Sequence, residues 1–181
     1  LLGGCQAGII LGSREWIARL RKHPMRRAFR VDKTTLAALD AVLGLYLAAE
    51  DRPAIPTLDR LALDLPALED RAGRLLAALT GDAPGNWTGR VVPGRSSVGG
   101  GSFSDTTVES RLVQWDGPKE ELERCHQELR RQDPALVGRM NQDGLAVDVR
   151  TLDEDELELA AAAFRVAWQA MASKRGTEKH D

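Results

Sequence analysis

The sequence contains few of the residues from which disulfide frameworks and metal sites are built. Its 181 residues include two cysteines and three histidines. Cys5 and Cys125 lie far apart and form no Cys-x-x-Cys pair, and the histidines show no metal-ligand spacing. These absences argue against a disulfide framework and a spaced zinc site, and they are typical of proteins in a reducing cytosol.

Long apolar runs and an excess of one charge are also missing. No apolar run reaches the ~18–20 residues that a membrane-spanning helix needs, so we expect no membrane partner. The 25 basic and 27 acidic side chains leave a net charge of −2, so nucleic-acid binding would need a local basic patch. The sequence also lacks a Ser/His/Asp triad pattern, a paired-carboxylate motif and an HExxH motif.

The composition that remains is globular, with 43% hydrophobic and 29% charged residues. The length suits one domain, or a small domain with part of another. Small and β-branched residues over 5–11 predict a buried strand that ends at Gly12. Ser13 is a suitable N-cap for a short helix that reaches Arg21, and Pro24 stops that helix.

The strongest periodic pattern is a helix over residues 32–49, whose leucines recur at three- and four-residue spacing. The polar segment 50–56 contains two prolines and breaks the pattern. We therefore predict a domain boundary after residue 52. The expected parts are residues 1–52, a small domain over 53–172, and a frayed tail over 173–181.

The small domain is predicted to be α+β, with helices packed on a mainly antiparallel sheet. A capping-box pair, Asp153 and Glu156, is expected to start the last helix, and residues 141–144 form a good hairpin turn. The elements expected, in chain order, are helix 66–79, strands 90–93 and 109–115, a helix opened by Pro118, strands 136–140 and 145–149, and a helix ending near Ala172.

A basic run over residues 23–33 is the first candidate site. Arg27 and Arg30 are three residues apart, so on a helical turn both guanidinium groups would point to one side. Guanidinium groups bind phosphate-like oxyanions bidentately and stay charged when partly desolvated. The run is therefore either an anion clamp or a solvated basic face that pairs with nearby carboxylates.

Two glycine-rich segments are weaker candidates. Residues 96–102 contain three consecutive glycines that expose backbone N–H groups, but no Walker or dinucleotide motif, so a flexible loop between strands is the alternative. At the other segment, Leu2-Gly3-Gly4-Cys5 imitates a lipoprotein cleavage site, but an apolar run follows it where a polar tether is expected. Cys5 itself is either a nucleophile or a small buried hydrophobe. Cys125 and His126 are adjacent and so diverge on a helix, and the four tryptophans are expected in a core or an interface.

Three stretches in order resemble the bacterial selenocysteine synthases, the L-seryl-tRNA(Sec) selenium transferases. They are residues 1–9 (LLGGCQAGI), 27–33 (RAFRVDK) and 98–102 (VGGGS), with a looser match near 151–153. The chain departs from the family pattern at Cys5, where the family usually has proline. It departs again at 103–105, where the family soon has a proline and this chain has Phe-Ser-Asp.

The resemblance implies part of a fold-type-I, overall α/β enzyme that uses pyridoxal 5'-phosphate (PLP). It implies that the PLP lysine lies just before Leu1, so that the chain alone is inactive. Arg27 and Arg30 would bind the selenium donor, selenophosphate. Cofactor contacts would fall to Gly3, Gly4 and Gln6, and to Gly100 and Ser102 in the loop.

In that family the enzyme converts seryl-tRNA(Sec) to selenocysteyl-tRNA(Sec) as a cytoplasmic homo-oligomer. The resemblance therefore implies seryl-tRNA(Sec) and selenophosphate as partners of the whole enzyme. Two alternatives remain open: a related PLP-dependent lyase or transferase of the same fold, and a non-catalytic binding or assembly module.

Overall fold

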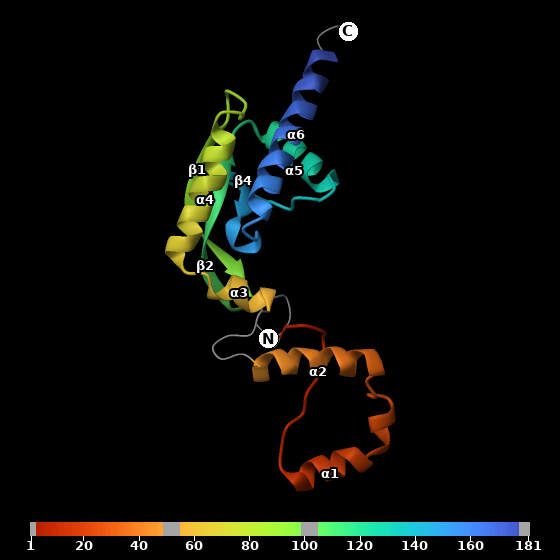
Figure 1. Cartoon of the computed structure of the whole chain (residues 1–181). Helices are drawn as coiled ribbons and strands as arrows, with labels where there is room; N and C mark the ends of the chain where they lie inside the picture. Colours follow the sequence, from red (N-terminus) through yellow and green to blue (C-terminus); the bar gives the residue numbers. More distant parts are fainter. Residues whose placement is uncertain (1–2, 49–54, 99–104, 178–181) are drawn as a thin grey trace. The chain divides into compact units, whose positions relative to one another are not determined.

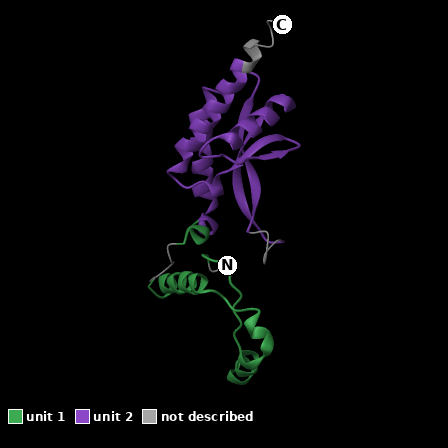
Figure 2. Ribbon diagram, turned by 90° about the vertical axis from the view of Figure 1, so that its right-hand side faces the viewer, with its two compact units in different colours: residues 1–59 green, residues 60–181 purple. Residues whose placement is uncertain are grey.

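The chain forms two compact units, residues 1–59 and 60–181 (Figures 1 and 2). The structure is a computed structural model that describes residues 3–48, 55–98 and 105–177. The boundary predicted after residue 52 falls among residues 49–54, which lie outside the described residues. It remains a prediction, and the two units divide after Asp59.

The first unit is helical in its described residues. Helix α1 spans Arg14–Lys22, a 3₁₀ helix η1 spans Pro24–Arg27, and α2 spans Lys33–Ala48. Ser13 caps α1 by accepting a hydrogen bond from the backbone N–H of Trp16 at 3.5 Å, as predicted. The helix ends at His23, whose extended backbone is the conformation that a following proline requires.

The strand predicted over residues 5–11 is wrong. These residues have no sheet pairing, and Ile9, Ile10 and Leu11 are exposed. An apolar run becomes a strand only where a neighbouring strand pairs with its backbone, and the described part of this unit supplies helices instead.

Two helices precede the sheet of the second unit, and the first of them begins before the boundary at Asp59. Helix α3, Pro56–Ala62, was not predicted, whereas α4, Leu65–Thr80, matches the predicted helix. Asp64 caps α4 by accepting from the backbone N–H of Ala67 at 2.9 Å, and Gly81 is its C-cap. The predicted apolar stripe of α4 is buried, namely Leu68, Ala72, Leu75 and Leu79.

A four-stranded antiparallel sheet in the order β1-β2-β4-β3 forms the centre of this unit. Its strands are β1 Thr88–Ser97, β2 Thr107–Asp116, β3 Arg139–Asn141 and β4 Gly144–Asp148. The predicted hairpin turn joins β3 to β4. There Gly144 has a φ of +128°, and a Cβ would run into the carbonyl oxygen of Trp115, so only glycine suits this position.

Helices α4 and α5 (Lys119–Arg131) pack on the strands, and α6 (Glu156–Thr177) packs against both helices (Figure 1). This arrangement confirms the predicted α+β domain. Helix α6 runs five residues beyond the expected end at Ala172, so residues 173–177 of the predicted tail are helical. The rest of the tail, 178–181, lies outside the described residues.

Aromatic rings fill the space between the sheet and α6. The centroids of Trp115 and Trp168 are 5.2 Å apart at 81°, and Phe164 and Trp87 lie 5.4 and 5.9 Å from Trp168. Edge-to-face contacts of this kind add to the free energy of burial. Three of the four tryptophans therefore lie in a core, as predicted, whereas Trp16 is exposed.

Arg150 lies buried between the sheet and the chain that leads into α4, in the 3₁₀ helix η2 (Val149–Thr151). Its guanidinium donates to the carbonyl oxygens of Arg60 at 2.6 Å, Leu63 at 3.1 Å and Glu109 at 2.6 Å, and to that of Leu61 at 3.3 Å. Burial lowers the pKa of this guanidinium, against a smaller opposite effect from Asp148. One side chain thus supplies the donors for four carbonyls from two segments, residues 60–63 and strand β2.

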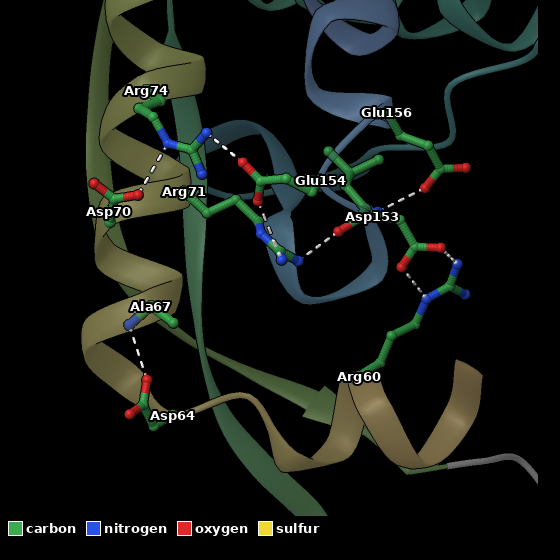
Figure 3. Close-up of polar contacts among 10 residues, drawn as sticks. Arg60, Asp64, Ala67, Asp70, Arg71, Arg74, Asp153, Glu154 and Glu156 are labelled. Carbon is green, nitrogen blue, oxygen red and sulfur yellow. Dashed lines mark hydrogen bonds and ion pairs between the residues drawn. The ribbon is translucent and has the colours of Figure 1, made fainter. Parts of the chain in front are cut away.

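A second polar network ties the start of α6 to α3 and α4 (Figure 3). Arg60 holds the carboxylate of Asp153 at 3.1 and 2.7 Å, and Arg71 donates to the carbonyl of Leu152 at 2.6 Å. Arg74 pairs with Glu154. Only half of the predicted capping box forms: the backbone N–H of Asp153 donates to Glu156 at 2.7 Å, while the Asp153 side chain binds Arg60.

The Arg60–Asp153 pair makes stability depend on pH. Hydrogen bonding from Arg60 holds the pKa of Asp153 below its usual range, so the pair stabilises the fold above the pKa of the unfolded chain. The contribution is lost as the pH falls through the folded pKa. We expect Asp153→Asn to cost about 0.5 kcal/mol at pH 7, because both side chains are more than a third exposed.

Urea unfolding at several pH values measures this effect. The parent should lose more stability than Asp153→Asn between about pH 5 and pH 2. Asp155→Asn is the matched control, since Asp155 forms no ion pair with any described residue. Identical pH profiles for the parent and Asp153→Asn would contradict the assignment.

Candidate functional site

The opening segment of the chain lies along α2. The thiol of Cys5 donates to the backbone carbonyl of Thr35 with Sγ and O 3.4 Å apart. The Cβ position of Gly4 faces Val42, and that of Gly3 faces Ile55. The first residues described thus meet the helix that follows the basic run. Cys5 behaves here as a partly buried side chain rather than an exposed thiol.

The backbone conformation at Gly3 and Gly4 favours glycine. Their φ values are +75° and +77°, in the left-handed region that favours glycine. A Cβ at either position would lie within van der Waals overlap of Ile55 or Val42. Packing against the chain itself therefore explains both glycines. A cofactor contact by them or by Gln6, which is exposed, remains a prediction.

Arg27 and Arg30 of the basic run lie on either side of a helix end. Arg27 is the last residue of η1, and the backbone N–H groups of Ala28 and Phe29 still donate to Met25, at 3.0 and 3.4 Å. Arg30 follows in irregular backbone. The helical spacing that was expected to place both guanidinium groups on one side is therefore not present at Arg30, because the helix ends at Ala28.

Both guanidinium groups are free within the described part of the chain. Arg27 and Arg30 are exposed, and neither donates a hydrogen bond or forms an ion pair with a described residue. The alternative interpretation, a basic face that pairs with nearby carboxylates, is not realised among those residues. Asp32, two residues after Arg30, is occupied elsewhere.

Asp32 caps α2. Its carboxylate accepts from the backbone N–H of Thr35 at 2.9 Å and from the Thr35 hydroxyl at 2.8 Å. The backbone hydrogen bond from Thr35, followed by the hydroxyl, lowers the pKa of Asp32. This cap was not predicted, although an Asp at the position just before a helix is its usual signal. The cap fixes the backbone immediately after Arg30.

We call Arg27, Arg30 and the first turn of α2 the arginine site. It places two cations that have no partner among the described residues next to the N-terminal end of a 16-residue helix, where the helix dipole also favours negative charge. Such a site can bind and orient a phosphate-like oxyanion. It contains no general base, because the Asp32 carboxylate is held by Thr35.

The other candidates do not join this site. Gly100 and Ser102 lie among residues 99–104, outside the described residues, so their role remains a prediction. Cys125 is fully buried, and burial raises the pKa of its thiol to about 12. The imidazole Nε2 of His126 lies 3.2 Å from the carbonyl of Gly138, so the two neighbours form no pair, as expected.

Known cofactor and metal sites do not fit the residues that the structure describes. Packing within the chain accounts for the left-handed Gly3 and Gly4, and the side chains of Lys22, Lys33 and Lys119 are exposed. Over residues 3–48, 55–98 and 105–177, no group of three or more His, Cys, Asp or Glu side chains is placed to hold a metal ion. None of the described helices combines the length and apolar character needed to cross a membrane.

Comparison with known proteins gives a consistent family. The family model for L-seryl-tRNA selenium transferase (SelA) matches residues 1–153. The chain is 42% identical over 166 residues to the L-seryl-tRNA(Sec) selenium transferase of Desulfomicrobium baculatum, covering 91% of this chain and 36% of that protein. It is 43% identical over 171 residues to that of Nitratidesulfovibrio vulgaris, covering 92% and 36%.

A third relative, the L-seryl-tRNA(Sec) selenium transferase of Solidesulfovibrio magneticus, is 41% identical over 174 residues, covering 93% of this chain and 37% of that protein. The chain thus spans about a third of the length of the curated relatives it matches. The match runs through the opening segment, the arginine site and most of the α+β domain. This chain belongs to the L-seryl-tRNA selenium transferase family.

Proposed function

We propose that the chain is the C-terminal part of an L-seryl-tRNA(Sec) selenium transferase and that its arginine site binds selenophosphate. The observation that carries the proposal is the pair of exposed guanidinium groups, Arg27 and Arg30, without partners among the described residues. They lie in a chain about 40% identical to enzymes of that name.

The chemistry of the site suits the donor. Selenophosphate presents phosphate-like oxygens, and guanidinium groups bind such oxygens through paired, charge-assisted hydrogen bonds. In the net reaction the donor's selenium replaces the serine hydroxyl, and inorganic phosphate is released. The two arginines would hold the phosphate part, orient the selenium, and stabilise the charge that grows on the leaving phosphate.

We assign the lysine that binds PLP to the part of the relatives' length that this chain does not match, and cofactor contacts from Gly3, Gly4 and Gln6 belong to the same proposal. When bound there, PLP supplies the electron sink for loss of the serine hydroxyl. Seryl-tRNA(Sec) as substrate, a homo-oligomeric enzyme and a cytoplasmic location belong to the same proposal for the whole protein. A PLP-dependent lyase of the same fold would not need the arginine pair.

A chimera tests the proposal in cells. The matched part of the Desulfomicrobium baculatum enzyme is replaced by this chain, and the chimera is expressed in a bacterium whose own selenium transferase gene is deleted. We expect selenium-75 to appear in selenoproteins. Absence of labelling from a well-expressed, folded chimera would contradict the proposed function.

The isolated chain supplies the complementary prediction. Purified residues 1–181, mixed with PLP and reduced with borohydride, should show no stoichiometric lysine adduct and no selenium transfer. The parent enzyme of Desulfomicrobium baculatum is the positive control. A stoichiometric adduct together with turnover by the chain alone would show that the cofactor site is here after all.

A further inference from the structure

Positive charge is concentrated in one short segment of the chain. Residues 14–33 carry eight basic and two acidic side chains, a net charge of +6, whereas the whole chain has a net charge of −2. The other residues therefore contain seventeen basic and twenty-five acidic side chains. A local basic patch is what nucleic-acid binding by this chain would require, and this segment supplies it.

Helix α1 is the part of this segment that the arginine site does not use. Its four cations are exposed, and none forms an ion pair with a carboxylate among the described residues. Among the described residues, the guanidinium of Arg19 lies 4.6 Å from the ring centroid of Trp16. The four cations are Arg14, Arg19, Arg21 and Lys22.

Helix α5 of the second unit is a solvated helix whose basic side chains are balanced by acidic ones, unlike those of α1. It also has three arginines and a lysine, but four glutamates balance them. Lys119 lies 3.9 Å from Glu123, and Arg131 lies 3.4 Å from Glu128. Helix α1 has one glutamate, Glu15, so its positive charge is left unneutralised.

Trp16 adds a second feature that suits a nucleic acid. Its side chain is 58% exposed and carries Arg19 beside it. Bases stack on exposed aromatic rings and on guanidinium planes without regard to sequence. An exposed Trp–Arg pair beside cations that form no ion pair with a described residue therefore offers both a base platform and phosphate contacts.

We propose that α1 is an RNA-binding surface that holds the phosphate backbone of the tRNA substrate through Arg14, Arg19, Arg21 and Lys22, with Trp16 against a base. This inference rests on the proposed function, which makes a tRNA the substrate. The composition favours RNA over a membrane surface: beside its four cations this nine-residue helix offers only Trp16, Ile17 and Leu20 as large apolar side chains.

Salt-dependent RNA binding tests the inference. The probe is a fluorescent tRNA(Sec) transcript, with an unrelated tRNA transcript beside it, and anisotropy is read from 50 to 300 mM salt. Changing the four cations of α1 to glutamine in the 181-residue chain should weaken binding of both RNAs by about 30-fold at 100 mM salt and lower the salt slope by about 3.

The chain offers a matched control on α5. Changing Lys119, Arg124, Arg130 and Arg131 to glutamine removes the same number and kind of exposed cations, and affinity should stay within about twofold of the parent. A variant with the three α1 arginines changed to lysine keeps the charge and should keep most of the affinity. Circular dichroism establishes that each variant is folded.

Several outcomes would overturn the inference. They are absence of RNA binding by the parent chain, equal losses from the α1 and α5 variants, and tighter binding to anionic phosphatidylglycerol vesicles than to RNA. In the chimera, an unchanged KM for seryl-tRNA(Sec) after the α1 substitutions would overturn it and leave the proposed function standing. An inactive chimera would contradict the proposed function while the RNA measurement on the 181-residue chain stands.

Discussion

In the chimera, changing Arg27 and Arg30 together to alanine should lower kcat/KM for selenophosphate by about 10³-fold. Each guanidinium can make charge-assisted hydrogen bonds worth about 1.5–3 kcal/mol to a phosphate-like group, and loss of two such contacts gives an effect of this size. The structure shows no described carboxylate that would take up their charge instead. The measurement is the initial rate of selenocysteyl-tRNA formation against selenophosphate concentration.

Two further variants separate donor binding from a general loss of charge. Arg26→Ala removes a neighbouring exposed arginine whose guanidinium donates to the carbonyl of Arg21 at 3.1 Å, and it should change kcat/KM for selenophosphate by less than about threefold. The double variant Arg27→Lys with Arg30→Lys keeps the charge but loses the bidentate geometry. Its kcat/KM for selenophosphate should lie between that of the parent chimera and that of the double alanine variant. An equal loss for Arg26→Ala would contradict a donor-specific role.

Arg150→Leu should reduce the free energy of unfolding by about 3–5 kcal/mol. The substitution removes the donors that serve the carbonyls of Arg60, Leu61, Leu63 and Glu109, and it leaves these acceptors with an apolar neighbour. Arg150→Lys should recover part of the loss, because an ammonium has three donors but lacks the planar fork. Urea unfolding followed by tryptophan fluorescence measures both, since three tryptophans lie in the core of the same unit.

Arg124→Leu is the control for this change. Arg124 is an exposed arginine on α5, and its replacement should change stability by no more than about 0.5 kcal/mol. A loss of less than about 1 kcal/mol for Arg150→Leu would show that water or other donors satisfy these carbonyls.

The parts of the fold that the sequence predicted are those set by local pattern. The stripe of α4 and the inward Leu122, Cys125 and Leu129 of α5 follow from 3.6-residue periodicity, and the turn before Gly144 follows from its own residues. These features depend on neighbours a few residues away, which a single sequence displays. Helix boundaries accordingly fall within a few residues of the expected ones.

The features that were predicted wrongly, or not predicted, depend on partners that are distant in sequence. Residues 5–11 have strand-like composition, but pairing requires a neighbouring strand, which composition does not reveal. Asp153 was expected to cap α6 with its side chain, yet Arg60, 93 residues away, binds that carboxylate. Arginine is usually a surface residue, so the sequence does not predict that Arg150 is buried. Only the folded chain shows the four carbonyls around it.

The candidate site was predictable to a different extent. The resemblance to the family followed from three motifs in the same order, and it singled out Arg27 and Arg30 as candidate donor-binding residues. The residues alone left an anion clamp and a solvated face open. The exposure of both guanidinium groups and the Asp32 cap required the structure. The structure also shows that Gly3 and Gly4 pack closely against Ile55 and Val42, which the sequence does not reveal.

The central claim is that this chain completes a selenium transferase, and one measurement on the purified chimera tests it most directly. Seryl-tRNA(Sec), PLP and selenium-75-labelled selenophosphate are incubated with the chimera, and label is followed into the aminoacyl group of the tRNA. We expect formation of selenocysteyl-tRNA(Sec) that requires selenophosphate and requires Arg27 and Arg30. Loss of the serine hydroxyl without selenium transfer, or transfer that is unaffected by loss of both arginines, would contradict the proposal.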